Sequence, residues 1–164
     1  MGCDIHGVIE VNKYPGRRHS HWPHAEVYLD RHYRLFGVLA GVRDDSVEPV
    51  VSPRGLPEDM SFKTRDLNEY YIADESLSGC EDRWILRSHL WPNAQIRDGH
   101  WAFDSDNHTH SWVTVPELRE AIKRFEGEDG KFCVPAELRA LLASMLMLDG
   151  DEEGRSRFVF WFDN

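Results

Sequence analysis

The chain has 164 residues, of which 41% are hydrophobic and 29% charged, and its formal net charge is −10 with neutral histidines. This composition is typical of one globular domain spanning residues 1–164 and excludes a disordered chain. The acidic balance argues against general nucleic-acid binding, which needs a basic surface, but it leaves room for a small anionic ligand held by a few arginines.

The first predicted element is a strand in MGCDIHGVIEV, because Val8–Val11 is rich in β-branched residues. Side chains on a strand alternate between its two faces. One face then carries Cys3, Ile5, Gly7, Ile9 and Val11 and is expected to join the core. The other carries Asp4, His6, Val8 and Glu10. This polar face is either an ordinary solvated surface or the wall of a functional site.

The next segment, residues 12–24, is interrupted by prolines and predicts a loop, followed by a short strand over 26–29 that pairs antiparallel with the first. Apolar residues at helical spacing predict a helix over 33–43. Residues 44–59 form a long irregular segment, and loops of this length are usually functional or mobile. A weakly patterned helix is expected over 62–75.

The second half begins with a short helix or strand over 83–87 and a polar, turn-rich segment over 93–112. Thr114 and Glu117 around Pro116 have the spacing of a capping box and predict the start of a helix. A second helix is expected over 136–148, and the continuous apolar run 158–162 predicts a strand buried on both faces. These elements indicate a single α+β domain: a small mixed or antiparallel sheet with the first and last strands near its centre and helices mainly on one face.

Cysteine usage and hydropathy indicate the compartment. The chain has three widely spaced cysteines, Cys3, Cys80 and Cys133, which is not the pattern of a disulfide framework. The start of the chain lacks the basic and apolar regions of a signal peptide, and no apolar run is long enough to span a bilayer. We therefore expect a cytoplasmic protein without a membrane partner.

The Asp4-Ile5-His6 segment is the first candidate for chemistry. An Asp-x-His pair on a strand places a carboxylate and an imidazole on one side, roughly 7 Å apart at Cβ. This arrangement suits two ligands of one divalent metal ion, or a base and its orienting carboxylate. Asp-Ile-His-Gly also resembles the first motif of the calcineurin-like metallophosphoesterases, but no Gly-Asp pair follows in the expected strand-end context, and Asn107-His108 lacks the glycine of the Gly-Asn-His motif.

An alternative zinc interpretation uses Cys3 and His6, which have Cys-x-x-His spacing. A strand points these two side chains to opposite faces, so this interpretation requires a turn in place of the strand.

Two further segments carry candidate residues. In the segment 104–112, His108 and His110 can act as a pair if the chain is extended, and the segment precedes a helix N-terminus, which favours anions; a solvated loop is the alternative. Arg54, in Ser-Pro-Arg-Gly-Leu-Pro, can bind a phosphate or carboxylate bidentately, or form a structural ion pair. Arg43 has the same two interpretations.

Four blocks of the chain together resemble a family of small uncharacterised bacteriophage proteins. The blocks are MGCDIH with Glu10, RHYRLFGVLAGVR (31–43), SPRGLPEDMS (52–61) and HTHSWVTVPEL (108–118). Thr109 stands where the family motif His-Ser-x-Ser-Trp has its first serine, and the chain beyond Glu126 has no counterpart. The resemblance implies a phage origin and the cytoplasm of a bacterial host, but no reaction. In the family, the position of His110 is not always histidine, which favours His108 as a metal ligand.

These observations support three functional hypotheses. The first is an enzyme that hydrolyses a phosphoester in a small anionic, nucleotide-like ligand. Its catalytic residues would be Asp4, His6, Glu10 and His108, with Asp4, His6 and His108 also holding one divalent metal (Zn, Mn or Fe). Ligand binding would use Arg43, Arg54, Tyr33, Ser111 and Trp112.

The second hypothesis is a non-catalytic binder that sequesters a nucleotide signal used in host defence, and a homo-oligomer is expected for it. Its arginines would bind phosphates, while Trp112, Trp101 or Tyr33 would stack on a base. The third is an acidic inhibitor that binds a basic host protein.

Overall fold

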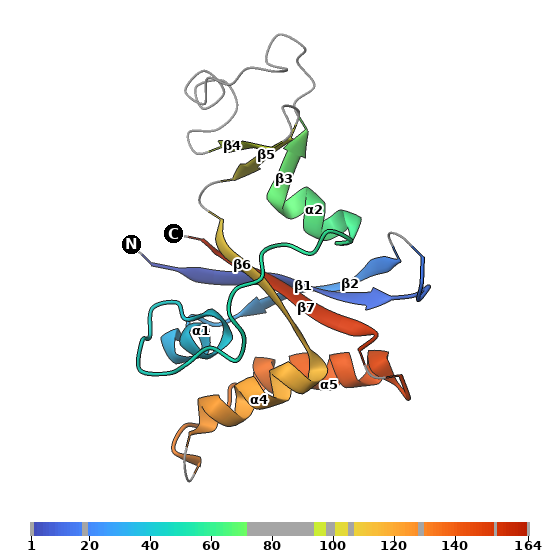
Figure 1. Cartoon of the computed structure of the whole chain (residues 1–164). Helices are drawn as coiled ribbons and strands as arrows, with labels where there is room; N and C mark the ends of the chain where they lie inside the picture. Colours follow the sequence, from blue (N-terminus) through green and yellow to red (C-terminus); the bar gives the residue numbers. More distant parts are fainter. Residues whose placement is uncertain are drawn as a thin grey trace.

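The computed structural model describes residues 2–17, 20–71, 94–97, 101–104, 107–127, 130–152 and 154–163. A four-stranded antiparallel sheet has the order β2-β1-β7-β6 (Figure 1). Its strands are β1 (Asp4–Asn12), β2 (His21–Leu29), β7 (Ser156–Asp163) and β6 (His108–Thr114). The first and last strands are thus neighbours at the centre of the sheet, as the sequence predicts.

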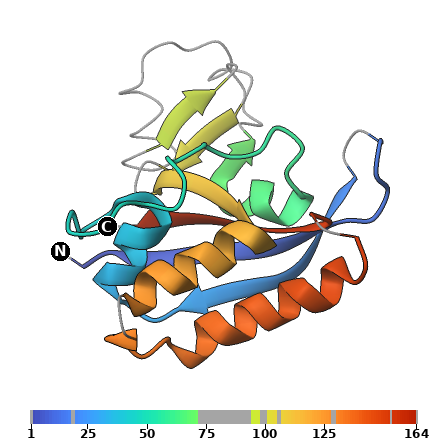
Figure 2. The same ribbon diagram turned by 60° about the horizontal axis from the view of Figure 1, so that its bottom comes forward.

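A smaller sheet has the order β3-β5-β4 and contains β3 (Glu69–Tyr71), β4 (Ala94–Arg97) and β5 (Trp101–Asp104). The helices are α1 (Tyr33–Ala40), α2 (Phe62–Asn68), α4 (Val115–Glu126) and α5 (Ala136–Asp149). Helices α4 and α5 lie on one face of the four-stranded sheet and α2 on the other (Figure 2). The predicted α+β fold is therefore confirmed. None of the helices among the described residues is long and apolar enough to cross a membrane.

The hydrophobic core lies between the four-stranded sheet and helices α1, α4 and α5. Phe158, Phe160 and Phe162 of β7 point into it and are fully buried. The ring of Phe36 in α1 packs edge-to-face on Phe162 with centroids 5.1 Å apart. Gly7 of β1 gives room to this layer, because a Cβ at Gly7 would lie 2.3 Å from Cε2 of Phe158. We call this side of the sheet the apolar face.

Local signals place two helix starts correctly. Helix α4 begins at the predicted capping box, in which the backbone N–H of Thr114 donates to Oε2 of Glu117 at 2.8 Å. Helix α5 begins at Ala136 after Pro135, as predicted. The predicted end of α1 at residue 43 is wrong, because Gly41 adopts a left-handed conformation with φ 69° and ends the helix at Ala40.

The prediction of a loop over residues 12–24 is wrong in its second half, since β2 begins at His21. Strand β2 is at the edge of the sheet, where Pro23 is tolerated because its missing N–H need not serve a second neighbour.

Two predictions in the middle of the chain also need correction. The helix expected over 62–75 ends at Asn68, where the chain enters β3. The segment 93–112, expected to be turn-rich, contains β4, β5 and the start of β6. Polar strands of this kind lack the apolar alternation that sequence patterns detect. The element expected over 83–87 lies outside the described residues.

Candidate functional site

His6 on β1 forms an imidazole–carboxylate pair with Asp163 on β7. Its Nε2 lies 3.0 Å from Oδ2 of Asp163, and the two side chains are 31% and 37% exposed. The ring is fixed by stacking on Trp161, with centroids 6.3 Å apart, and by an edge contact with Tyr28 at 5.9 Å. A hollow of about 40 Å³ lies beside it, lined also by Glu26 and Leu67 of α2. A carboxylate on one ring nitrogen orients the imidazole and leaves the other nitrogen for proton transfer.

Asp4 lies beside this pair but is itself bound to an arginine. Nε and Nη2 of Arg31 donate to the two carboxylate oxygens of Asp4, each at 2.8 Å. The hydrogen bonds and charge of Asp4 raise the pKa of Arg31 above its ordinary value. The backbone N–H of Asp4 donates to Oδ1 of Asp163 at 3.1 Å, so Asp163 contacts both predicted residues. We call Asp4, His6, Arg31 and Asp163 the amino-terminal cluster.

Glu10, also on the polar face of β1, is fully buried beneath the first turn of α2. Its Oε1 accepts hydrogen bonds from the backbone N–H of Ser61 at 2.6 Å and from the hydroxyl of Thr64 at 2.5 Å. Its Oε2 accepts from Nε of Arg157, on β7, at 2.8 Å. These contacts bind the start of α2 to the middle of the sheet, and they place Glu10 in a structural network away from His6.

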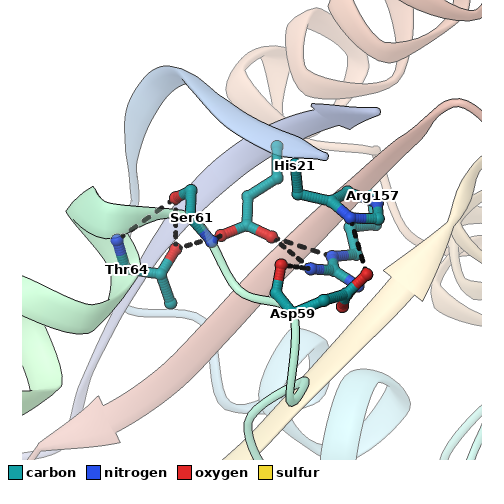
Figure 3. Close-up of polar contacts among 6 residues, drawn as sticks. His21, Asp59, Ser61, Thr64 and Arg157 are labelled. Carbon is teal, nitrogen blue, oxygen red and sulfur yellow. Dashed lines mark hydrogen bonds and ion pairs between the residues drawn. The ribbon is translucent and has the colours of Figure 1, made fainter. Parts of the chain in front are cut away.

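The same network extends outward through Arg157 to Asp59 and His21 (Figure 3). Nη1 of Arg157 donates to Oδ1 of Asp59 at 2.8 Å, and Oδ2 of Asp59 lies 2.9 Å from Nδ1 of His21. Burial by itself raises the pKa of Asp59. The hydrogen bond and charge of Arg157, together with the charge of His21, have a larger combined effect and hold this pKa below its ordinary value. Burial, followed by the charge of Arg157, lowers the pKa of His21, which favours its neutral form. We call Glu10, Arg157, Asp59, His21, Ser61 and Thr64 the Glu10 network.

Three of the predicted ligand-binding residues come together at the start of α4. Both Nη atoms of Arg54 bind the carboxylate of Glu117, and its guanidinium lies 4.3 Å from the centroid of the Trp112 ring. The buried hydroxyl of Ser111 accepts a hydrogen bond from the backbone N–H of Arg54 at 3.3 Å. Burial raises the pKa of Glu117, but hydrogen bonds from Arg54 and Thr114 hold it below its ordinary value. The geometry here is that of the structural ion pair, one of the two interpretations of Arg54.

Arg43 and Tyr33 lie near opposite ends of α1. Arg43 follows the helix with φ 64°, and its guanidinium interacts with the thiol of Cys3. Burial raises the pKa of the Cys3 thiol, while Arg43 acts in the opposite direction. Tyr33, the first residue of α1, is 45% exposed and packs its ring edge on Phe36. Cys3 and Cys133 are both free thiols, and Cys80 lies outside the described residues.

His108 and His6 project from opposite faces of the sheet. His6 pairs with Trp161 and His108 with Phe162, and adjacent residues of β7 alternate between faces. The His108 ring stacks on Phe162 at 6.0 Å, and its Nδ1 contacts the hydroxyl of Thr109 at 2.8 Å. The structure therefore does not bring His108 together with Asp4 and His6.

The side chain of His110 points towards α2 and not along the direction of His108, because strand β6 is irregular between His108 and Ser111. Thr109 has φ 52°, and Nε2 of His110 lies 3.1 Å from Oδ1 of Asn68 at the end of α2. Burial, followed by the charge of His108, lowers the pKa of His110 to about 4.

In the part of the chain that the structure describes, no group of three or more His, Cys, Asp or Glu side chains is arranged to hold a metal ion. The divalent metal therefore stays a prediction. Its predicted ligands Asp4 and His6 share the amino-terminal cluster with Asp163, a residue that the sequence did not single out.

Sequence reasoning missed Asp163, Arg31, Arg157 and Asp59. A signal for two of them is present, because Arg157 and Asp163 flank the apolar run 158–162. Pairing this run antiparallel with the first strand brings Asp163 opposite Asp4 and Arg157 opposite Glu10. Arg31 and Asp59 lie outside strands and helices, and no periodicity marks them.

Comparison of the chain with protein-family models, with curated proteins and with solved structures gives no match. Function is therefore argued from the geometry of the clusters described above.

Proposed function

We propose that the protein acts on a small anionic, nucleotide-like ligand by acid–base hydrolysis at the amino-terminal cluster. The observation that carries this proposal is the His6–Asp163 pair, 3.0 Å apart and partly exposed beside a hollow. Asp163 holds the imidazole through Nε2, and Nδ1 accepts the proton of an attacking water. Arg31, beside the pair, attracts the anionic ligand.

In an alternative form of this proposal the cluster holds a divalent metal, Zn, Mn or Fe, and His6 then serves as a ligand instead of the general base. Asp4 and His6 would be its ligands, and His108 would not, because it projects from the opposite face of the sheet. A bound metal would supply Lewis-acid activation of the phosphoryl group. In this state Arg31 would release the carboxylate of Asp4 and be free to bind the anion.

The test is a hydrolysis assay with bis-p-nitrophenyl phosphate and cyclic nucleotides, with added Zn, Mn or Fe and with chelator. We expect His6→Gln to lower kcat by about 10²–10⁴-fold, the usual contribution of a general base. Asp163→Asn should lower kcat less and shift the pH profile, because Asp163 positions the imidazole. The matched control is His24→Gln, which changes an exposed histidine on the neighbouring strand. Turnover that is unchanged in His6→Gln would remove this cluster from the mechanism.

A second candidate is the non-catalytic binder that counters host defence by sequestering a nucleotide signal. The guanidinium of Arg54 lies 4.3 Å from the centroid of the Trp112 ring, and this favours the binder, because the predicted phosphate-binding arginine and base-stacking ring lie side by side. Recovery of intact ligand in stoichiometric amount after incubation would support this candidate. Chemically altered ligand would support the enzyme.

A further inference from the structure

Helix α5 is apolar on the side that faces away from the sheet as well as on the side that packs on it. On the inner side, Leu138, Leu141 and Met145 are buried in the core. On the outer side, Met147 is 85% exposed. We call the exposed apolar residues of this helix the outer face of α5: Ala136, Ala140, Ala143, Leu146 and Met147.

The neighbouring helix α4 shows that this surface is unusual. Both helices cover the apolar face of the sheet, and α5 is the outermost element at the bottom of the molecule in Figure 2. The exposed residues of α4 beyond its first turn are all charged: Arg119, Lys123 and Glu126. A helix at the surface normally has such a polar outer side, and a helix that is apolar all round is normally covered. The outer face of α5 therefore has the character of an interaction surface.

The charges that flank α5 favour a second copy of this chain as the partner. Lys131 precedes the helix, Asp151 follows it, and both side chains are exposed. In an antiparallel pair of helices, the end of each helix lies beside the start of the other. Lys131 of one copy is then near Asp151 of the other at both ends of the contact, and the two helix dipoles are also opposed.

The sizes of the outer side chains suit the same antiparallel arrangement. When the two helices cross at the middle of α5, Ala140 of one copy lies opposite Ala143 of the other, and the small side chains allow the helix axes to approach. The large Met147 then lies opposite the small Ala136. Each copy contributes one helix of 14 residues, so the contact is small and the dimer belongs to the weak class.

We propose that the outer face of α5 is the interface of a weak homodimer, in which α5 pairs antiparallel with α5 of a second copy. Pairing removes Leu146 and Met147 from water, which is the driving force. The opposite charges at the two ends fix the direction of the partner helix. This interface is independent of the chemistry proposed for His6, which lies on the other face of the sheet.

Sedimentation equilibrium of the full chain, from micromolar to millimolar concentration, tests the interface. We expect a monomer–dimer equilibrium in this range. Met147→Lys should weaken dimerisation at least about tenfold, because it places a charge in the apolar contact. The matched control is Phe62→Lys, which makes the same change of charge at an apolar residue that is 60% exposed on α2, on the other face of the sheet. This control should dimerise like the wild type.

Two charge reversals test the antiparallel arrangement. Lys131→Glu and Asp151→Lys each place like charges at both ends of the homodimer, and each should weaken it about three- to tenfold. An equimolar mixture of the two variants restores opposite charges at both ends. The mixture should therefore form heterodimers with an affinity close to that of the wild type.

A chain that stays monomeric at millimolar concentration would overturn the proposal, and the outer face of α5 would then need a different partner. A dimer that Met147→Lys leaves unchanged would also overturn it. A mixture of the charge-reversed variants that associates no better than either variant alone would exclude the antiparallel arrangement. Because both charge reversals lie outside α5, they keep the test valid even if Met147→Lys fails to fold.

Discussion

The two faces of the four-stranded sheet are buried by different means, and β7 contributes to both. On the apolar face its phenylalanines, Phe158, Phe160 and Phe162, pack against α1, α4 and α5. On the opposite face Arg157 is 7% exposed and binds Glu10, which is fully buried. Apolar burial is non-directional and tolerates repacking, whereas a buried ion pair depends on the position of each atom.

This difference bears on where function can arise. Charges that are held by several partners stay in fixed positions, and fixed polar groups are what binding and catalysis require. The site proposed at the amino-terminal cluster lies on the polar face, beside Leu67 of α2. The apolar face supports the sheet that holds it.

The largest expected effect comes from breaking the buried ion pair. Arg157→Met should lower the free energy of unfolding by about 3–5 kcal/mol, because it leaves the carboxylate of Glu10 buried without its cation. Urea denaturation measures this loss. The double variant Glu10→Gln, Arg157→Met should lose less than the sum of the two single changes. Strict additivity would mean that the two side chains do not act as a pair.

The apolar face can be tested at Gly7. Gly7→Ala should cost about 1–3 kcal/mol, because a Cβ at this position would lie 2.3 Å from the ring of Phe158. Thermal or urea unfolding gives the value. Adding Phe158→Leu should recover part of the loss, because the smaller side chain makes room for the methyl group. If Gly7→Ala is as stable as the wild type, the two strands are less closely packed than described.

The polar contact between β6 and α2 predicts a dependence on pH. The pKa of His110 is lowered to about 4 in the folded protein from an ordinary 6.5, so the unfolded chain takes up the proton first on acidification. The contribution of His110 to the free energy of unfolding is therefore fully present above about pH 6.5, and it is lost as the pH falls towards about 4. From about pH 7 to about pH 5 we expect a loss of about 2 kcal/mol.

His110→Gln is the matched variant, since an amide can still bond to Asn68 but does not titrate. Between about pH 7 and about pH 5, the free energy of unfolding of this variant should fall by about 2 kcal/mol less than that of the wild type. Parallel curves for the variant and the wild type would contradict the low pKa.

The smallest effect is expected at the start of α4, on the edge strand of the sheet. Thr114→Ala removes the side chain of the capping box and should cost about 1 kcal/mol. Thr114→Ser keeps the hydroxyl and should restore most of that loss in the same unfolding assay. Equal stability of the alanine and serine variants would show that the cap contributes nothing to the fold.

Local sequence signals predict those elements whose own residues determine them. The β-branched run in β1, the capping box of α4 and the apolar run of β7 each carry the signal in neighbouring residues. The starts of β2 and β6 and the short strands β4 and β5 carry little such signal. Their position depends on neighbours in the sheet, which a local pattern does not contain.

The candidate sites show the same limit. The alternation of β1 correctly grouped Asp4, His6 and Glu10 on one face, but not their partners. Asp163 binds the backbone of Asp4 across 159 residues of chain, and Arg157 binds Glu10 across 147. His108 was grouped with His6 by residue type, and only the pairing of β6 with β7 shows that the two project from opposite faces.

The pairing of β1 with β7 also has a consequence for how the protein is made. Because the two central strands are separated by most of the chain, the edge of β1 that pairs with β7 stays open while the ribosome synthesises everything between them. Contacts of such long sequence separation close late and slow the folding of a domain. Helices α4 and α5 leave the ribosome before β7 does, so their contacts with β7 can form only after the last strand has been synthesised. An open strand edge can pair with other chains, so we expect co-expressed chaperones to raise the yield of folded protein.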